Sequence, residues 1–169
     1  MLPPAPNKED WSPTLADFTS PSLIIPYLEA GDATTAIREL STSLQREGLI
    51  TDLLQFYQAV LNREFLCHTV TEPGWAMPHA VGRHLTQPYF ALGRWTPPRL
   101  WLKSGQVVKL IFLMAVPETD ARGYLNLLSG VARLSKRPEL IDQILRAGDA
   151  KEMFGILRGV QLPSRAALV

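Results

Sequence analysis

The sequence has little cysteine and almost no net charge, and each shortage excludes a class of protein. A single cysteine among 169 residues excludes an internal disulfide framework, so we expect a reducing compartment, the cytoplasm. Seventeen Lys and Arg residues nearly balance sixteen Asp and Glu residues, and the net charge is +1. No block of like charges stands out along the chain. We therefore expect no nucleic-acid partner.

Long apolar runs and nucleotide-binding loops are also missing. The longest strongly apolar run, Leu110 to Val116, is far shorter than the roughly 20 residues that span a bilayer. Residues 1–6 have neither the basic start nor the apolar stretch of a signal peptide. These features predict a soluble protein without direct membrane insertion. The sequence contains no G-x-x-x-x-G-K-[ST] loop, and we expect no cofactor.

The composition is that of a folded domain. Hydrophobic residues make up 46% and charged residues 20% of the chain, which is typical of globular rather than disordered proteins. Its length is that of one ordinary domain with a sizeable core. Because proline and polar groups dominate residues 1–21, we interpret them as a flexible arm. The folded domain is expected at 22–159, with a tail at 160–169.

Apolar spacing and helix-capping residues predict an alternation of strands and helices. Helices are expected from Asp32 to Gly48, from Thr51 to Glu64, from about Asp120, from Pro138 to Gly148, and from Asp149 to Leu157. Strands are expected at 23–25, 89–92, 100–102 and 107–116, with a turn-rich excursion over 93–105. The run 107–116 is nearly unbroken apolar, as in a strand buried on both faces. The pattern predicts one α/β domain.

The stretch from Arg63 to His79 is the most informative in the chain. It joins the end of a predicted helix to a short extended segment that delivers a histidine. Met77 precedes a proline and is therefore biased towards an extended backbone, and Pro78 cannot donate a backbone hydrogen bond. His79 thus comes at the end of a strand, where side chains often face a crevice. A neutral imidazole with one free ring nitrogen suits the uptake of a phosphoryl group.

The residues in this stretch fall into a recognisable register. The pattern R-E-x(4)-T, at Arg63, Glu64 and Thr69, is followed by G-x-A-x-P-H ending at His79. It resembles the active-site stretch of the fructose/mannitol-type (type 2) enzyme IIA domains of the bacterial phosphoenolpyruvate-dependent phosphotransferase system, which include the nitrogen-regulatory enzyme IIA. The resemblance continues through 107–117 and 125–132, and covers roughly residues 18–158. It implies a mixed β-sheet covered by helices on both faces, and a phosphotransferase that works as a phosphohistidine carrier.

The resemblance also implies roles for individual residues and partners. His79 would accept a phosphoryl group from the histidine-containing phosphocarrier protein and pass it to an enzyme IIB, or hold it as a regulatory signal. Arg63 and Thr69 would stabilise the phosphate. Tyr124 stands where such domains commonly carry a second histidine, and its hydroxyl can donate a hydrogen bond but carries no positive charge. No IIB or membrane IIC domain is evident in the sequence, which favours the nitrogen-regulatory branch.

Three other interpretations of the same residues stay open at this point. The chain can be an interaction protein of the same fold, with phosphoryl transfer weakened or lost, that binds partners around His79 and Trp95. Trp95 and Trp101 are either packed in the core or exposed to a partner. A metal site at His68, His79 and His84 matches no common ligand spacing. A Cys67–His79 hydrolase lacks an identifiable oxyanion site, and Cys67 is instead expected to be a small buried hydrophobe.

Overall fold

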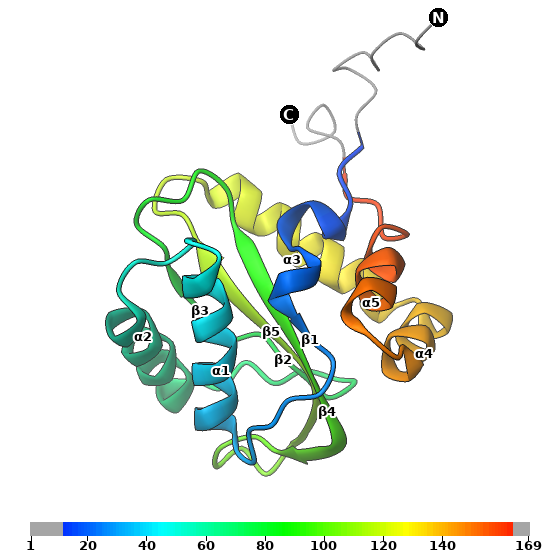
Figure 1. The fold of residues 1–169 in the computed structure, drawn as a ribbon, viewed down its shortest axis with the longest axis horizontal. Helices are drawn as coiled ribbons and strands as arrows, with labels where there is room; N and C mark the ends of the chain where they lie inside the picture. Colours follow the sequence, from blue (N-terminus) through cyan, green and yellow to red (C-terminus); the bar gives the residue numbers. More distant parts are fainter. Residues whose placement is uncertain (1–11, 164–169) are drawn as a thin grey trace, which may run out of the picture.

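The computed structural model describes residues 12–163, which form one mixed α/β domain (Figure 1). Its strands are β1 (Ile24–Ile25), β2 (Trp75–Ala76), β3 (His79–Val81), β4 (Tyr89–Leu100) and β5 (Val107–Val116). Its α-helices are α1 (Ala33–Arg46), α2 (Leu53–Leu66), α3 (Ala121–Ser135), α4 (Pro138–Arg146) and α5 (Ala150–Leu157), preceded by the 3₁₀ turns η1 (Leu15–Phe18) and η2 (Pro21–Leu23). No helix of this part of the chain is long and apolar enough to cross a membrane.

The five strands form a single mixed sheet within residues 12–163. Its order is β1-β4-β5-β2, with β4 and β5 antiparallel and β1 parallel to β4. Both β2 and β3 run parallel to β5 along its other edge, β2 beside Leu110 and β3 beside Met114. The expected interior strand over 107–116 is therefore confirmed, since β5 has partners on both sides.

Helices cover both faces of this sheet, as predicted. Alternate residues of β5 point to opposite faces: Phe112 joins a cluster with η1, α3, α4 and α5, whereas Leu113 joins a cluster with α1 and α2 (Figure 1). Both side chains are fully buried. Burial of an aliphatic or aromatic side chain of this size stabilises the fold by about 1.5–3 kcal/mol. The two layers hold α2 and α3 on opposite sides of the strand ends that form the site described below.

The helix ends agree closely with the capping residues in the sequence. Asp32 accepts a hydrogen bond from the backbone N–H of Thr35 at 2.8 Å, and Asp149 caps α5 in the same way. The second helix is capped by Asp52 rather than Thr51, because the Asp52 carboxylate accepts the N–H of Gln55 at 3.0 Å. A carboxylate at this position also favours the positive end of the helix dipole.

The prediction for residues 93–105 differs from the structure. The turn-rich part of residues 93–105 is confined to the segment after Leu100, and there is no separate strand at 100–102, because β4 continues to Leu100 and pairs again with β5 at Arg99. An irregularity between Arg94 and Arg99 absorbs Pro97 and Pro98, which cannot donate ladder hydrogen bonds. The tryptophans of this segment, Trp95 and Trp101, are 2% and 0% exposed. Core packing of both is confirmed, and neither belongs to a partner-facing surface.

The predicted arm ends too late and the predicted tail begins too early. Leu15 and Phe18 are buried in the core, as are Val160 and Leu162 near the other end. Thr14 bridges Gln161 in an antiparallel pair, so residues near the two ends of the described part of the chain lie side by side. Residues 12–21 and 160–163 are therefore parts of the packed domain. The rest of the predicted arm, including Trp11, and residues 164–169 of the predicted tail lie outside the described residues.

Candidate functional site

The site begins where one edge of the sheet is interrupted. β2 and β3 lie in line along β5, and Met77 and Pro78 separate them. Because Pro78 has no N–H, pairing resumes only through its carbonyl, which accepts the N–H of Met114 at 2.9 Å. The sequence predicted His79 at the end of a strand. In the structure it is instead the first residue of β3. It lies opposite Met114 on β5.

Gly74 explains the start of the G-x-A-x-P-H pattern. Its φ is +95°, a region that residues with a side chain rarely adopt. A Cβ at this position would also lie 3.1 Å from the carbonyl oxygen of Val107. Gly74 thereby lets the tight turn from Thr71 to Trp75 approach β5 closely, and its carbonyl accepts the N–H of Lys109 at 2.7 Å. The turn sets where β2 starts, and hence where His79 falls.

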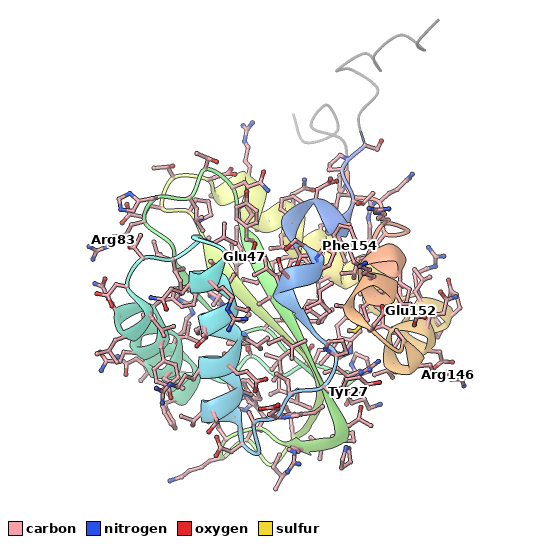
Figure 2. The ribbon with its side chains drawn as sticks, in the orientation of Figure 1. Tyr27, Glu47, Arg83, Arg146, Glu152 and Phe154 are labelled. Carbon is pink, nitrogen blue, oxygen red and sulfur yellow. The ribbon has the colours of Figure 1, made fainter. Side chains whose placement is uncertain are left out.

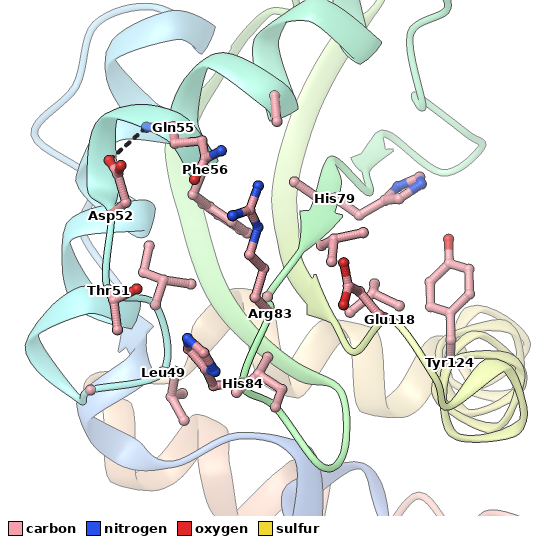
Figure 3. A pocket seen from close by; sticks show the side chains of 18 of the residues that line it. Leu49, Thr51, Asp52, Gln55, Phe56, His79, Arg83, His84, Glu118 and Tyr124 are labelled. Carbon is pink, nitrogen blue, oxygen red and sulfur yellow. Dashed lines mark hydrogen bonds between the residues drawn. The ribbon is translucent and has the colours of Figure 1, made fainter.

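A pocket with a volume of about 610 Å³ opens beside His79. Figure 3 shows that Tyr124 from α3 directs its hydroxyl towards the His79 side of this pocket. The two rings lie 5.5 Å apart between centroids, at an interplanar angle of 40°. Arg63, in the last turn of α2, also lines the pocket. Its guanidinium makes no hydrogen bond to residues 12–163, which leaves its donors available to an anion.

The imidazole of His79 has two different ring nitrogens. Nδ1 lies 3.2 Å from the carbonyl oxygen of Met77. A carbonyl can only accept, so Nδ1 carries the proton and Nε2 keeps a free lone pair. Burial lowers the pKa of His79 and the nearby Arg63 lowers it further, while the bond to Met77 and the charge of Glu64 oppose the shift. The neutral, nucleophilic form is therefore favoured near pH 7.

Tyr124 meets the same half-buried surroundings. Burial raises the pKa of its phenol, against a smaller opposing effect of Arg63. The hydroxyl thus stays protonated at neutral pH and can donate one hydrogen bond towards a group held at Nε2. Together, the pocket offers an uncharged nucleophile, a neutral donor and a guanidinium, which suits an incoming phosphoryl group.

Thr69 is not brought into the pocket. Its hydroxyl oxygen accepts the backbone N–H of Met77 at 2.9 Å, so it contacts the segment that carries His79 rather than the space in front of the ring. Cys67 is exposed, which corrects the expectation that it is buried, and it does not line the pocket. His68 lies outside the pocket as well, while His84 lines its far end (Figure 3). No group of three or more His, Cys, Asp or Glu residues within 12–163 is arranged to hold a metal ion.

The sequence analysis missed three charged residues of the pocket: Asp52, at the start of α2, and two residues that follow strands. Glu118 follows β5 and Arg83 follows β3 (Figure 3). The two strands are parallel, so their carboxyl ends meet at one edge of the sheet, as the bond from Gly82 N–H to the Val116 carbonyl at 2.8 Å demonstrates. Polar residues just after parallel strands are the available signal. It could be used only once the pairing of β3 with β5 was known.

A second hollow lies on another part of the surface. It is formed between α4 and α5 by residues that include Glu139, Asp142, Arg146 and Glu152. Figure 2 shows Arg146 and Glu152 on the opposite side of the molecule from Arg83. Glu152 is engaged there by the backbone N–H of Gly148, as part of the helix start. The hollow is thus separate from the His79 pocket.

Comparison with known proteins places this geometry in a family. The sequence model described as "Phosphoenolpyruvate-dependent sugar phosphotransferase system, EIIA 2" matches residues 17–159. The fructose-specific EIIABC component of Bacillus subtilis (strain 168) is 30% identical over 132 residues, which are 77% of this chain but 21% of that protein. The chain thus spans about a fifth of that relative. The nitrogen regulatory protein of Bradyrhizobium diazoefficiens is 26% identical over 149 residues, 85% of this chain and 94% of the relative.

Solved structures share the same fold. The nitrogen regulatory protein IIA-Ntr from Neisseria meningitidis superimposes with a TM-score of 0.70 at 24% identity, over 85% of this chain and 98% of the other. The enzyme IIA in a complex of IIAMTL with phosphorylated IIBMTL from Escherichia coli gives a TM-score of 0.69 at 16% identity, over 83% and 96%. The mixed sheet with helices on both faces is therefore the architecture of these domains.

Proposed function

Because this chain belongs to the EIIA type 2 family of the phosphoenolpyruvate-dependent phosphotransferase system, we propose that it is a phosphocarrier whose acceptor is Nε2 of His79. The donor is the histidine-containing phosphocarrier protein. The Nε2 lone pair attacks phosphorus, a new P–N bond forms, and the P–N bond to the donor's imidazole breaks. The observation that supports this most is the bond between Nδ1 and the Met77 carbonyl, which leaves Nε2 unprotonated.

Arg63 and Tyr124 have distinct tasks in this transfer. The guanidinium of Arg63 offsets the negative charge of the phosphoryl oxygens, and the Tyr124 hydroxyl donates one further hydrogen bond. Phosphoryl transfer depends chiefly on such positioning and charge stabilisation, so no nucleotide fold or metal ion is needed in this step. The donor already carries an activated phosphoryl group.

Exposed apolar side chains beside the site support a protein as donor and acceptor. Phe65 follows two residues after Arg63, Val81 two residues after His79, and Leu125 directly after Tyr124. Their exposed fractions are 62%, 51% and 63%. Of the three, Val81 lines the pocket, while Phe65 and Leu125 lie on the two helices, α2 and α3, that carry Arg63 and Tyr124. Exposed large apolar side chains on the elements of a site favour a protein–protein contact there. A partner protein would cover them during transfer.

The phosphoryl group then has two destinations in the proposal. An enzyme IIB is the first, by analogy with the IIA–IIB complex and with the EIIABC relative, whose name joins the A and B components. The second is a regulatory use, as the name of the Bradyrhizobium relative indicates for that protein. Of the two destinations, we propose the regulatory use as the preferred one.

The direct test is phosphoryl uptake on the purified protein. Incubation with phosphoenolpyruvate, enzyme I and the phosphocarrier protein should add the mass of one phosphoryl group, in an acid-labile linkage. His79→Ala should abolish the adduct. His84→Ala, at the far end of the pocket, and His68→Ala, outside it, serve as matched controls that keep it. An adduct that persists in His79→Ala, or that is lost from a control variant, would contradict the assignment.

The competing function is a binding protein of the same fold that lacks phosphoryl transfer. Tyr124 favours it, because a neutral hydroxyl stands where such domains commonly carry a second histidine. Under this alternative, folded wild-type protein would acquire no phosphoryl mass from the complete donor system, yet would still bind partners over the apolar surface around His79. The uptake experiment above therefore separates the two functions.

A further inference from the structure

Glu64 is a buried carboxylate directly after the arginine that lines the pocket. Its side chain is 3% exposed and points into the core, away from the pocket that Arg63 faces. Oε2 accepts two hydrogen bonds, from the backbone N–H of Thr69 at 3.1 Å and from the indole N–H of Trp101 at 2.9 Å. These contacts tie the end of α2 to the loop before β2 and to the end of β4.

A core built for stability alone would not favour this arrangement. Burial of a carboxylate is costly unless both oxygens have partners. The second oxygen, Oε1, is buried and has no hydrogen-bond partner among residues 12–163. The carboxylate is kept for the two N–H groups at Oε2, because an apolar side chain in place of Glu64 would leave those of Thr69 and Trp101 without an acceptor.

The hydrogen bonds from Glu64 continue to His79. Thr69, held through its N–H by Glu64, accepts the N–H of Met77 on its own hydroxyl oxygen at 2.9 Å. The carbonyl of Met77 in turn accepts from Nδ1 of His79 at 3.2 Å. Both polar groups of the Met77 backbone are thus engaged, one by Thr69 and one by His79. The chain runs from a fixed core carboxylate to the reacting imidazole.

We propose that Glu64 and Thr69 are positioning residues that fix the Met77 carbonyl, and through it the orientation and tautomer of the His79 ring. The inference rests on the proposed function for its effect on phosphoryl transfer. It gives Thr69 a contact with the Met77 backbone in place of the phosphate contact expected from the sequence. With the carbonyl fixed, Nδ1 keeps its proton and Nε2 faces the pocket. The charge of Glu64 also favours a proton on this ring, against the effects of burial and of Arg63.

Thr69 offers the sharper test, because valine has nearly the same shape but no hydroxyl. Thr69→Val leaves the Met77 N–H without its acceptor, whereas Thr69→Ser keeps one. We expect nitrogen-15 NMR of the unphosphorylated protein to show a larger fraction of Nε2–H tautomer at His79 in Thr69→Val, and wild-type values in Thr69→Ser. Phosphoryl uptake should fall by about tenfold in Thr69→Val and recover in Thr69→Ser.

The glutamate is tested in the same two ways. Glu64→Gln keeps an oxygen for the N–H groups of Thr69 and Trp101, so His79 should keep its tautomer and uptake should stay within about threefold of wild type. Glu64→Leu removes the acceptor and should shift the tautomer as Thr69→Val does. Wild-type tautomer and uptake in Thr69→Val would overturn the inference. No uptake by the wild type would overturn the proposed function instead, and the NMR comparison would still decide the positioning role.

Discussion

The hydroxyl of Tyr124 is an uncharged donor at physiological pH, and burial raises its pKa still further above that range. A charge-assisted hydrogen bond is roughly twice as strong as a neutral one. Tyr124 therefore gives the developing phosphoryl oxygens less stabilisation than a protonated histidine at the same place would. The proposed carrier should be functional but slow, with Arg63 as the main source of positive charge.

A series at this position measures that difference. We expect Tyr124→His to take up phosphoryl groups faster than wild type, by about tenfold, and Tyr124→Phe to be slower by up to about 10²-fold. All three side chains fit at the partly exposed helix surface, so thermal unfolding should change little. Uptake would be timed for the three proteins with one donor. Equal rates would mean that the hydroxyl does not face the phosphoryl group.

The pKa of the His79 ring also depends on its individual neighbours. Burial and Arg63 lower its pKa, so the neutral ring persists below the ordinary histidine value of about 6.5 and is lost only at lower pH. Because the folded protein binds this proton less readily than the unfolded chain, His79 contributes stability above pH 6.5 that is lost as pH falls through its folded pKa. Uptake should therefore hold from neutral pH to below 6.5, and decline only as the pH falls through the lowered pKa of His79 in the folded protein.

Arg63→Gln tests the electrostatic part of this shift. Without the guanidinium, the midpoint of an NMR titration of the His79 ring should move upwards, towards the ordinary value, and uptake should fall because phosphate loses its cation. Arg83→Gln is the matched control, since Arg83 lines the same pocket but is not among the causes of the shift. An unchanged midpoint in Arg63→Gln would show that burial alone lowers the pKa.

Single residues also mark where sequence reasoning reached its limit. The order Arg63, Thr69, His79 was readable, but whether Thr69 faced the pocket or the backbone was not, because the contact between its hydroxyl and Met77 depends on how the turn at Gly74 folds back. Cys67 was expected to be buried from its residue type. It follows the last residue of α2 and is exposed. Residue type alone does not report on such local chain reversals.

At the scale of elements, β5 is the central strand, because it pairs with β4 on one side and with β2 and β3 on the other. Ile111 is fully buried, and β4 and β2 flank it on either side. Ile111→Asp would bury an unpaired charge at a cost of several kcal/mol, against a total stability of about 5–15 kcal/mol. We expect little folded protein. Val107→Asp makes the same kind of change at the 49% exposed start of the strand and should leave the thermal midpoint nearly unchanged.

A comparable loss of stability in both variants would mean that burial does not explain the effect. A soluble Ile111→Asp protein that melts near the wild type would show that this part of β5 tolerates water. Circular dichroism during heating, together with the soluble yield, is sufficient for the comparison.

The elements that sequence patterns predicted best were those with a local cause. Helix starts followed from capping carboxylates such as Asp32 and Asp149, and β5 followed from its apolar run. β4 was cut short in the prediction because Pro97 and Pro98 read as a break. In the structure the strand resumes after an irregularity, since pairing with β5 is recovered at Arg99. That recovery is a tertiary effect, and no local pattern announces it.

For the whole molecule, the proposed transfer requires a second protein to contact the mouth of the pocket. Leu125→Asp places a charge on the 63% exposed side chain beside Tyr124 and should raise the donor concentration for half-maximal uptake by about tenfold, without loss of stability. Leu100→Asp is the matched control, because Leu100 is 62% exposed but lies at the far end of β4. Equal effects of both variants, or none from either, would place the docking surface elsewhere.

The short outer strands have a consequence for how this protein meets others. β1 has two residues, while β2 and β3 offer two and three with Pro78 between them. β4 extends beyond β1, but Pro97 and Pro98 remove two donors from that stretch. Within residues 12–163, the sheet therefore has no long, regular edge strand to which a peptide of another protein could pair as an added strand. In the proposed function, a partner would therefore bind through side chains rather than by adding a strand to the sheet, and the same short edges disfavour aggregation by strand addition.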